Sequence, residues 1–319
     1  MAKHTKYLAV CVMVLSLAVS CRKHDPAADG MSGMAPVEFG ASGVWSKAVV
    51  RDDGFVAGDA IGVMGYYVPP GEDWDVYRHE SRPDFMYNRK VSYDGISWSY
   101  SPVAYWPQKD GAEVNFYAYF PWNESSSGEG VSVSSAMTQG EPSFTFVLNE
   151  SADVDLMVAK NEGMASDDGP VYLDFHHMLG KLQFKFGVTD EGGFSYVVNK
   201  IKVLSTPHKA EYSWGEDSFT VLSSAPVVAS AGEHGVGHLV NSTEPILADA
   251  FTMFLMPGRL GVIEITINNE DARQIDLSDV MIESGKVMTV KMIINLTGIQ
   301  FYTSVSDWKD GGTANGNIS

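Results

Sequence analysis

Short segments in which apolar and polar residues alternate run along most of this chain, and long helical periodicity is scarce. Near the N-terminus, Val37, Phe39 and Ala41 alternate with Glu38 and Gly40. A period of two places alternate side chains on one face of a β-strand. By this pattern and by β-forming composition, we predict further strands over residues 60–67, 114–120, 171–175, 182–188, 200–204, 251–256, 261–267, 286–296 and 299–305.

One hairpin is predicted from its turn. Residues 91–98 place β-forming side chains on both sides of Asp94-Gly95. This dipeptide suits the two positions of positive φ in a type I′ turn. Many short strands with turn signals between them favour β-sandwiches over helical or α/β folds.

The predicted fold is therefore all-β, with two tandem β-sandwich domains over residues 36–165 and 166–310. A mature chain of about 300 residues is long for one core and comfortable for two domains. The stretch Ser151–Gly169, with few apolar runs after Val158, is the best candidate for the boundary. Residues 311–319 have nothing to bury and are predicted to be a flexible tail.

The N-terminus predicts an export signal over residues 1–20. A basic start is followed by an apolar run over residues 7–18, and a run of 12 residues is shorter than the ~20 that a membrane-spanning helix needs. Small residues then precede Cys21, which favours cleavage and lipidation there by the lipoprotein route. Acyl chains would anchor the protein firmly. The alternative is an ordinary cleaved signal with an incidental cysteine. Residues 21–35 are predicted to be a lipidated tether.

Charge and cysteine content limit the kinds of partner and of chemistry that the mature chain can have. Removing residues 1–20 takes away two lysines and no acid, which leaves 20 basic and 40 acidic side chains. Such a negative field repels nucleic acid and anionic lipid, so no nucleic-acid partner is expected. Cys11 lies in the segment to be removed and Cys21 would be acylated, so the mature chain is expected to lack a free thiol for a disulfide or a nucleophile.

The sequence holds only poorly supported candidates for a metal-binding or catalytic site. Asp174, His176 and His177 could suggest a metal site, but neighbouring strand residues face opposite sides. His234 and His238 have helical i, i+4 spacing, yet the glycines around them disfavour a helix. The chain has no nucleophile elbow, P-loop or dinucleotide fingerprint, and no carboxylate pair stands out. We therefore expect no enzymatic activity, no cofactor and no metal site.

Aromatic residues leave a second function open. Trp74, Trp98, Trp106 and Trp122 lie among tyrosines in the N-terminal half. Such residues are more often core or cross-strand pairs, but an exposed row would stack on sugars. The alternative function is thus a surface lipoprotein that binds a glycan or a host protein.

Four segments with recognisable sequence follow one another through nearly the whole mature chain. They are Gly58–Val63 after a strand and a basic site, Val91–Trp106 continued by Val114–Pro121, Asp155–Ala159 with Val171–Leu182, and Asp307–Gly311. In this order, and together with Cys21, they resemble the fimbrillin (type V pilin, Mfa-like) lipoproteins. Each segment is degenerate alone, and their order makes the match specific.

The resemblance implies two transthyretin-like β-sandwiches, export as an outer-membrane lipoprotein, and assembly into a cell-surface fimbrium with a role in adhesion. It also implies a mechanism. A trypsin-like protease cuts behind the first strand, the strand leaves an apolar groove, and a C-terminal strand from another pilin subunit fills that groove. An open sheet edge accepts a foreign strand, and alternate side chains set its register.

Candidate residues for each step can be assigned. The groove strand would present Val37, Phe39 and Ala41, and the donor strand Ile299, Phe301, Thr303 and Val305. Cleavage would follow Lys47 or Arg51. Lys47 precedes a small residue, as the family pattern requires, although arginine is more usual there; an acid after Arg51 disfavours cutting. The alternatives of a first strand that never leaves, and of a stalk, tip or anchor role, remain open.

Overall fold

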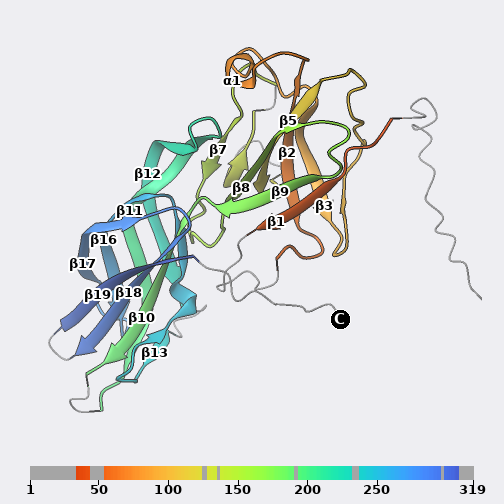
Figure 1. The fold of residues 1–319 in the computed structure, drawn as a ribbon. Helices are drawn as coiled ribbons and strands as arrows, with labels where there is room; N and C mark the ends of the chain where they lie inside the picture. Colours follow the sequence, from red (N-terminus) through yellow and green to blue (C-terminus); the bar gives the residue numbers. More distant parts are fainter. Residues whose placement is uncertain are drawn as a thin grey trace, which may run out of the picture. The chain divides into compact units, whose positions relative to one another are not determined.

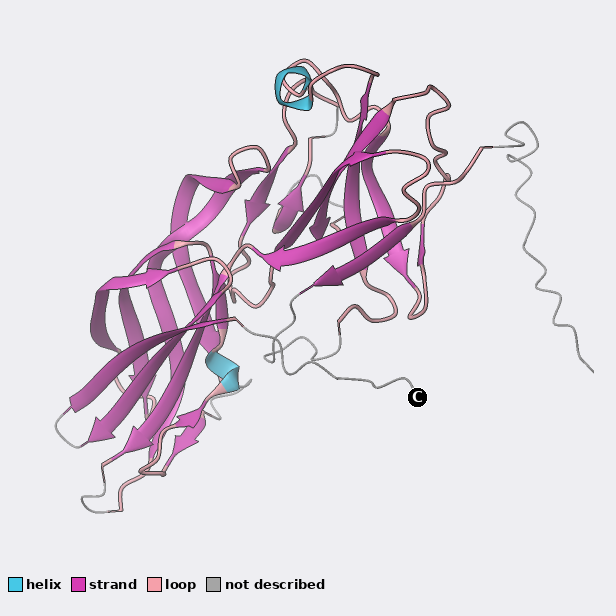
Figure 2. Ribbon diagram, viewed as in Figure 1, coloured by secondary structure: helices cyan, strands magenta, loops and turns pink. Residues whose placement is uncertain are grey.

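The computed structural model describes residues 34–43, 54–123, 128–134, 137–189, 193–231, 237–295 and 298–308. These residues are mostly β-strand, with one short α-helix, α1 (Trp74–Tyr77), and one 3-10 turn, η3 (Asp249–Phe251) (Figures 1 and 2). The all-β prediction is confirmed. None of the helices in the described ranges has the length and apolar content needed to span a lipid bilayer.

The strands follow the chain in order. They are β1 (Phe39–Gly43), β2 (Ala60–Val68), β3 (Met86–Tyr93), β4 (Trp98–Ser99), β5 (Glu113–Phe120), β6 (Gly130–Ser132), β7 (Ser143–Val147), β8 (Met157–Met164), β9 (Val171–His177), β10 (Gly180–Val188), β11 (Tyr196–Ser213), β12 (Ser218–Ser230), β13 (His238–Val240), β14 (Ile246–Leu247), β15 (Met253–Leu255), β16 (Gly258–Ile267), β17 (Arg273–Ile282), β18 (Lys286–Asn295) and β19 (Gly298–Asp307).

Backbone hydrogen bonds join these strands into three sheets. The first has the order β1-β9-β8-β5-β2-β3-β4. The second has the order β14-β10-β18-β19, with β15 also paired to β10. The third has the order β17-β16-β11-β7-β6, with β12 and β13 also paired to β11. The first and last strands, β1 and β19, therefore each lie at the edge of a sheet.

The first sheet is buried on both faces at its centre. Strand β5 lies between β2 and β8, and its side chains enter two different apolar clusters. Val114 and Phe116 belong to one cluster, and Tyr117 and Tyr119 belong to the other. The alternation in the sequence predicted a strand there, but only the packing shows that neither face of β5 is wet.

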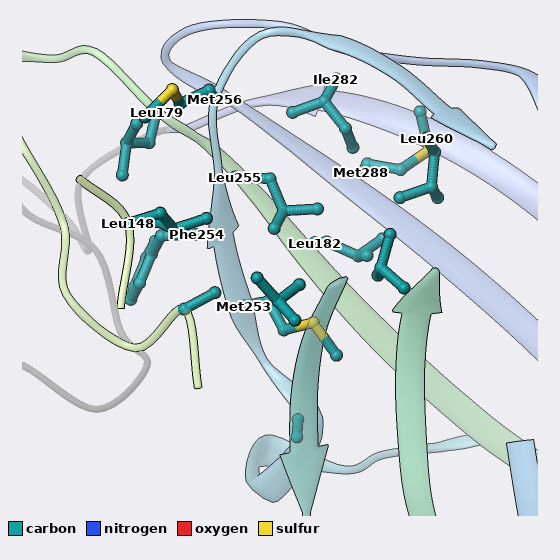
Figure 3. Packing of buried hydrophobic residues seen from close by; sticks show 14 of the residues in the cluster. Leu148, Leu179, Leu182, Met253, Phe254, Leu255, Met256, Leu260, Ile282 and Met288 are labelled. Carbon is teal, nitrogen blue, oxygen red and sulfur yellow. The ribbon is translucent and has the colours of Figure 1, made fainter. Parts of the chain in front are cut away.

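The larger cluster fills the space between the second and third sheets. Figure 3 shows Leu182 and Met288 from the second sheet beside Leu260 and Ile282 from the third. All four side chains are at most 6% exposed. Burying an aliphatic side chain of this size contributes roughly 1.5–3 kcal/mol. Two sheets that share one apolar layer form a β-sandwich, as the spacing of short strands predicts.

The predicted hairpin forms with a different turn. Strands β3 and β4 pair through Tyr93 and Trp98, which leaves a four-residue loop in place of a two-residue turn. Gly95 has φ of 98°, whereas Asp94 is outside the positive-φ residues. The Asp94 carboxylate instead accepts the N–H groups of Ile96 and Ser97 at 2.8 and 2.7 Å. The type I′ prediction is therefore wrong, because this side chain satisfies the loop donors itself.

Two further strand predictions need correction. The stretch 251–256 begins as part of η3 and becomes strand only at Met253. The stretch 200–204 is a small part of β11, which has 18 residues and pairs with β12, a strand of 13 residues that the pattern did not predict. Most of β12 is exposed, so it lacks the apolar alternation that would have marked it.

The division at residue 165 stays a prediction, as does the transthyretin-like arrangement. The described residues from Ala35 onward group into one compact unit. Strands β8 and β9 flank residue 165 and pair with each other in the first sheet. The predicted signal peptide, nearly all of the tether, and the tail at 311–319 lie outside the described residues.

Candidate functional site

Strand β1 closes one edge of the first sheet. It runs parallel to β9, with Phe39 opposite Val171 and Gly43 opposite Phe175. A parallel edge strand covers backbone N–H and C=O groups of its neighbour that would otherwise be unpaired. The residues predicted to fill a groove thus lie where the sheet would be open without them.

Residues just before β1 are tied to a second stretch of chain. The Val37 N–H donates to the carbonyl of Ala104 at 2.9 Å, and the Trp106 N–H donates to the carbonyl of Ala35 at 3.0 Å. The Tyr100 hydroxyl donates to the carbonyl of Val37 at 2.8 Å. The N-terminal segment is therefore held by hydrogen bonds both to β9 and to the loop after β4.

The side chains of this segment enter an apolar cluster. Val37 is 2% and Phe39 is 8% exposed, and Ala41 packs against the same cluster. The Phe39 ring lies edge-on to Tyr100 and to Phe116, with ring centroids 5.5 Å apart in both pairs. The buried residues around them are Ile61, Val63, Met86, Val91, Trp106, Val114, Phe116, Ala118, Met157, Ala159, Val171, Leu173 and Phe175.

The outer face of β1 carries one aromatic contact. The Tyr172 ring of β9 lies over Gly40, since a Cβ placed on Gly40 would be 2.7 Å from Cδ1 of that ring. The Ser42 hydroxyl donates to Asp174 of β9 at 3.1 Å. These contacts are exposed, so the docking of β1 depends mainly on its inner side chains and its backbone pairing.

Strand β19 closes one edge of the second sheet. Among the strands of the described ranges it pairs with β18 alone, in antiparallel register from Asn295 opposite Gly298 to Lys286 opposite Asp307. Every residue from Gln300 to Asp307 is exposed. A strand held mainly by one ladder of backbone hydrogen bonds, with little side-chain burial, separates from its sheet at a lower cost than a central strand.

The predicted donor residues share one face of β19. Their partners in β18 are Ile294, Met292, Val290 and Met288, in the order Ile299, Phe301, Thr303 and Val305. Directly paired residues of neighbouring strands lie on the same face, and these four partners are all buried. Phe301 and Val305 are nevertheless 40% and 52% exposed. The core side of β19 thus leaves an apolar stripe accessible to solvent.

A buried polar pair lies close to the end of β19, and sequence reasoning did not single it out. Nδ1 of His177 lies 2.5 Å from Oδ2 of Asp155. Burial raises the pKa of the Asp155 carboxyl, and the contact with His177 opposes that rise. Both residues stand in segments of recognisable sequence, but 22 positions separate them and no local pattern joins them.

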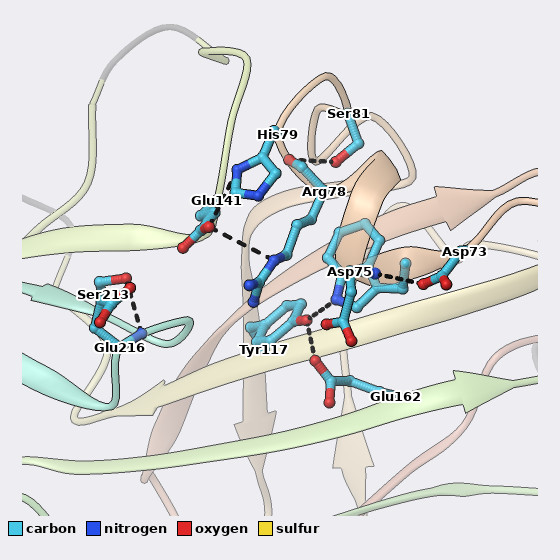
Figure 4. A network of polar contacts seen from close by, with 11 residues as sticks. Asp73, Asp75, Arg78, His79, Ser81, Tyr117, Glu141, Glu162, Ser213 and Glu216 are labelled. Atoms are coloured by element: carbon cyan, nitrogen blue, oxygen red, sulfur yellow. Dashed lines mark hydrogen bonds and ion pairs between the residues drawn. The ribbon is translucent and has the colours of Figure 1, made fainter.

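A second polar network lies beside α1 (Figure 4). The Tyr117 hydroxyl accepts from Nε1 of Trp74 at 2.8 Å and donates to the Glu162 carboxylate. Burial, followed by the hydrogen bond to the Glu162 carboxylate and by the charge of that group, raises the pKa of Tyr117. Nε of Arg78 lies 3.5 Å from Glu141. A tyrosine kept neutral between two partners rigidifies packing and is a poor proton donor at neutral pH.

Metal-binding geometry is lacking among the residues that the structure describes, where no three His, Cys, Asp or Glu side chains converge. His176 is exposed and His177 is buried, so the two neighbours do face opposite sides of β9. His238 is described and packs near Phe186, whereas His234 lies outside the described residues.

The tryptophans considered as a sugar platform take part in packing. Trp106 is 3% exposed, and Trp74, Trp98 and Trp122 are half-buried. Trp98 lies edge-on to Phe55, and the Lys90 ammonium lies 4.4 Å from the Trp122 ring centroid. A stacking platform requires free ring faces, which these contacts restrict.

Three predicted positions lie outside the described residues. They are the lipidation site Cys21 and the cleavage candidates Lys47 and Arg51. Both cleavage candidates fall between β1 and β2 in the chain, because residues 44–53 follow β1 directly.

Strands β1 and β19 thus both lie at sheet edges, with Phe39 of β1 buried and residues 300–307 of β19 exposed. The chain belongs to the fimbrillin-like family, whose model matches residues 46–308. Membership of this family supports a role as a subunit of a fimbrium at the cell surface.

Individual relatives agree with this assignment. The chain is similar to fimbrium subunit Fim1C of Phocaeicola vulgatus, with 25% identity over 138 residues; the match covers 40% of this chain and 36% of that relative. Its fold is similar to a fimbrial protein of Bacteroides vulgatus, with a TM-score of 0.66, 16% identity, and coverage of 86% and 99%. Its fold is also similar to a candidate cell adhesion protein of Bacteroides uniformis, with a TM-score of 0.56 and 19% identity. That match covers 87% of this chain and 98% of the other.

Proposed function

We propose that this protein is a structural, non-enzymatic subunit of an adhesive fimbrium, and that it joins other pilin subunits by strand exchange. In this proposal β1 leaves the first sheet after cleavage by a trypsin-like protease. The vacated groove then accepts β19 from a neighbouring subunit. Each subunit would in this way supply the edge strand that the next one lacks.

One observation carries the proposal: one edge strand has its apolar side chains buried, whereas the other leaves apolar side chains exposed. The N-terminal segment places Val37 and Phe39 in an apolar cluster at a sheet edge. Strand β19 has the same alternation of apolar side chains and leaves Phe301 exposed on its core side. Withdrawing β1 would expose buried apolar surface to water, which costs about 25 cal/mol of free energy per Å². A strand with the same period of apolar side chains would cover that surface again.

Export as an outer-membrane lipoprotein is part of the same proposal. Cys21 would carry the lipid and become the first residue after removal of residues 1–20. Replacing Cys21→Ala is expected to abolish incorporation of labelled palmitate in the producing cell. Unchanged labelling of the C21A chain would refute lipidation at this residue and leave the strand exchange standing.

The processing step is tested with the purified chain. Trypsin treatment of the wild type is expected to yield a ladder of polymers on electrophoresis. Lys47→Ala is expected to remove the ladder if cleavage follows that residue, with Arg51→Ala as the matched control. A wild-type chain that is cut between β1 and β2 and stays monomeric would refute the proposed exchange.

Contact between β19 and the groove is tested by cross-linking. Tyr172 and Tyr302 are 69% and 59% exposed, so cysteines there should not disturb a core. Tyr172→Cys in one subunit is expected to form a disulfide with Tyr302→Cys, or with Gln300→Cys or Ser304→Cys, in another after processing. Val221→Cys on β12, where the side chain is 47% exposed, serves as the control. Equal yields with the control would count against the exchange.

The division into two transthyretin-like β-sandwiches is also proposed. Calorimetric unfolding of the intact chain is expected to show two separate transitions, one for each sandwich. A single cooperative transition would show that the halves do not unfold separately.

A further inference from the structure

Trp308 differs sharply from the strand that leads to it. It follows β19 directly and is 5% exposed, while residues 300–307 are all exposed. The backbone N–H of Trp308 donates to the carbonyl of Gly285 at 3.0 Å. The end of an exposed edge strand is thus fixed by one buried indole.

The Trp308 ring lies flat against two other rings. Its centroid is 3.8 Å from that of His177 at an interplanar angle of 5°, and 5.4 Å from that of Phe254 at 6°. The Lys181 ammonium lies 5.8 Å from the Trp308 centroid. Aromatic pairs contribute about 0.5–1.5 kcal/mol beyond their area burial. Trp308 therefore makes more contact with the body of the protein than the residues of β19 before it.

The surface beneath Trp308 is polar. Lys181 is 3% exposed, and His177 is 6% exposed and held by Asp155. The indole Nε1 of Trp308 and Nε2 of His177 are buried, and neither makes a hydrogen bond to another described residue. Groups of this kind are costly to keep dry, and water would solvate them if Trp308 moved out. Hydration of these polar atoms would offset part of the free energy lost when the apolar contacts of Trp308 break. Withdrawing the indole therefore costs less than exposing a purely apolar contact of the same size.

Other ties at this end of β19 are weaker. Asp307 lies 2.5 Å from the Lys286 ammonium, but both side chains are exposed. An exposed ion pair contributes about 0–1 kcal/mol. A cavity of about 360 Å³ lies against Trp308 and is lined by His176, His177, Met178, Asp217, Ser284 and Gly285. The buried indole therefore borders a cavity and is not enclosed by packed side chains on every side.

We propose that Trp308 is a clamp that keeps β19 docked on its own subunit, and that withdrawal of the indole from His177 and Phe254 is the step that frees the strand. The release step rests on the proposed strand exchange, which it deepens by naming the contact that must break first. The clamp itself is a property of the single subunit and is measured without any polymer.

The test uses hydrogen exchange of the intact, unprocessed monomer. Trp308→Ala is expected to speed exchange of the β19 amides by about tenfold or more, because the strand opens locally at a smaller cost. Trp308→Phe keeps a stacking ring and is expected to give a smaller increase. It also keeps the test decisive if the alanine variant fails to fold. Tyr302→Ala, on the same strand, is the matched control with an unchanged rate. A rate for W308A equal to that of Y302A would overturn the clamp.

The release step is measured separately by ladder growth after processing. Trp308→Ala is expected to shorten the lag of polymerisation. A disulfide across the Lys286 and Asp307 pair, made by K286C and D307C, is expected to block growth until it is reduced. Faster amide exchange without faster growth, in a wild type that does polymerise, would overturn the release step. A wild type that never polymerises would refute the exchange, while amide exchange would still decide the clamp.

Discussion

The Tyr100 hydroxyl donates a hydrogen bond to the carbonyl of Val37, with the two oxygens 2.8 Å apart. The same oxygen accepts from the N–H of Ala104 at 3.3 Å. One side chain thus bridges the segment before β1 and the loop after β4. Because it touches the N-terminal segment and not the centre of the sheet, it offers a way to test how that segment is held.

Alkaline pH is expected to weaken this bridge. Burial raises the pKa of Tyr100 from 10.0 to about 12. The stability that the neutral tyrosine supplies is fully present below pH 10 and is lost as pH rises through about 12, because the unfolded chain ionises first. Unfolding in urea, followed from pH 9 to about 12.5, should show Tyr100→Phe less sensitive to pH than the wild type. Identical pH profiles would contradict the shift.

Removing the Phe39 ring is expected to undock the N-terminal strand. Phe39 is 8% exposed and packs edge-on against two rings, so Phe39→Ala should lower the free energy of unfolding by about 3 kcal/mol. Ser42→Ala, an exposed change on the same strand, should cost less than about 0.5 kcal/mol. Urea midpoints measure both. A small loss in F39A would mean that β1 contributes little to the fold of the monomer.

Close packing at Gly62 predicts a cost for any added side chain. A Cβ at Gly62 would lie 2.3 Å from the ring of Tyr119, which is fully buried and donates to Asn88. Gly62→Ala is therefore expected to lower the free energy of unfolding by about 1–3 kcal/mol. Gly298→Ala, where nothing lies within 4 Å, is the control. Equal thermal midpoints for the two variants would show that Tyr119 moves freely.

The Tyr117 hydroxyl is expected to matter for stability and not for chemistry. Tyr117→Phe removes the hydrogen bonds to the Trp74 indole and to Glu162, which keeps its ion pair with Lys160, so a loss of about 1–3 kcal/mol is expected. Tyr172→Phe removes an exposed hydroxyl and should leave the urea midpoint unchanged. A Y117F midpoint equal to that of Y172F would mean that water replaces the lost hydrogen bonds.

The amino-acid sequence was sufficient to predict strands and the apolar face of several of them. Val37 with Phe39 and Phe301 with Val305 were identified because a period of two depends only on neighbours along the chain. The structure also places both segments at sheet edges. The hairpin at Asp94 was found by the same local reasoning, although its loop differs, since side-chain hydrogen bonds to the backbone compete with standard turns.

Contacts between distant segments were decided by the tertiary structure alone. The pairing of β1 with β9, the burial of both faces of β5, and the stack of Trp308 on His177 each join residues far apart in the chain. No local pattern encodes which strand becomes an edge or which histidine meets which indole. Those choices follow from the packing of all the strands at once, because a side chain is buried only when the partners that cover it are in place.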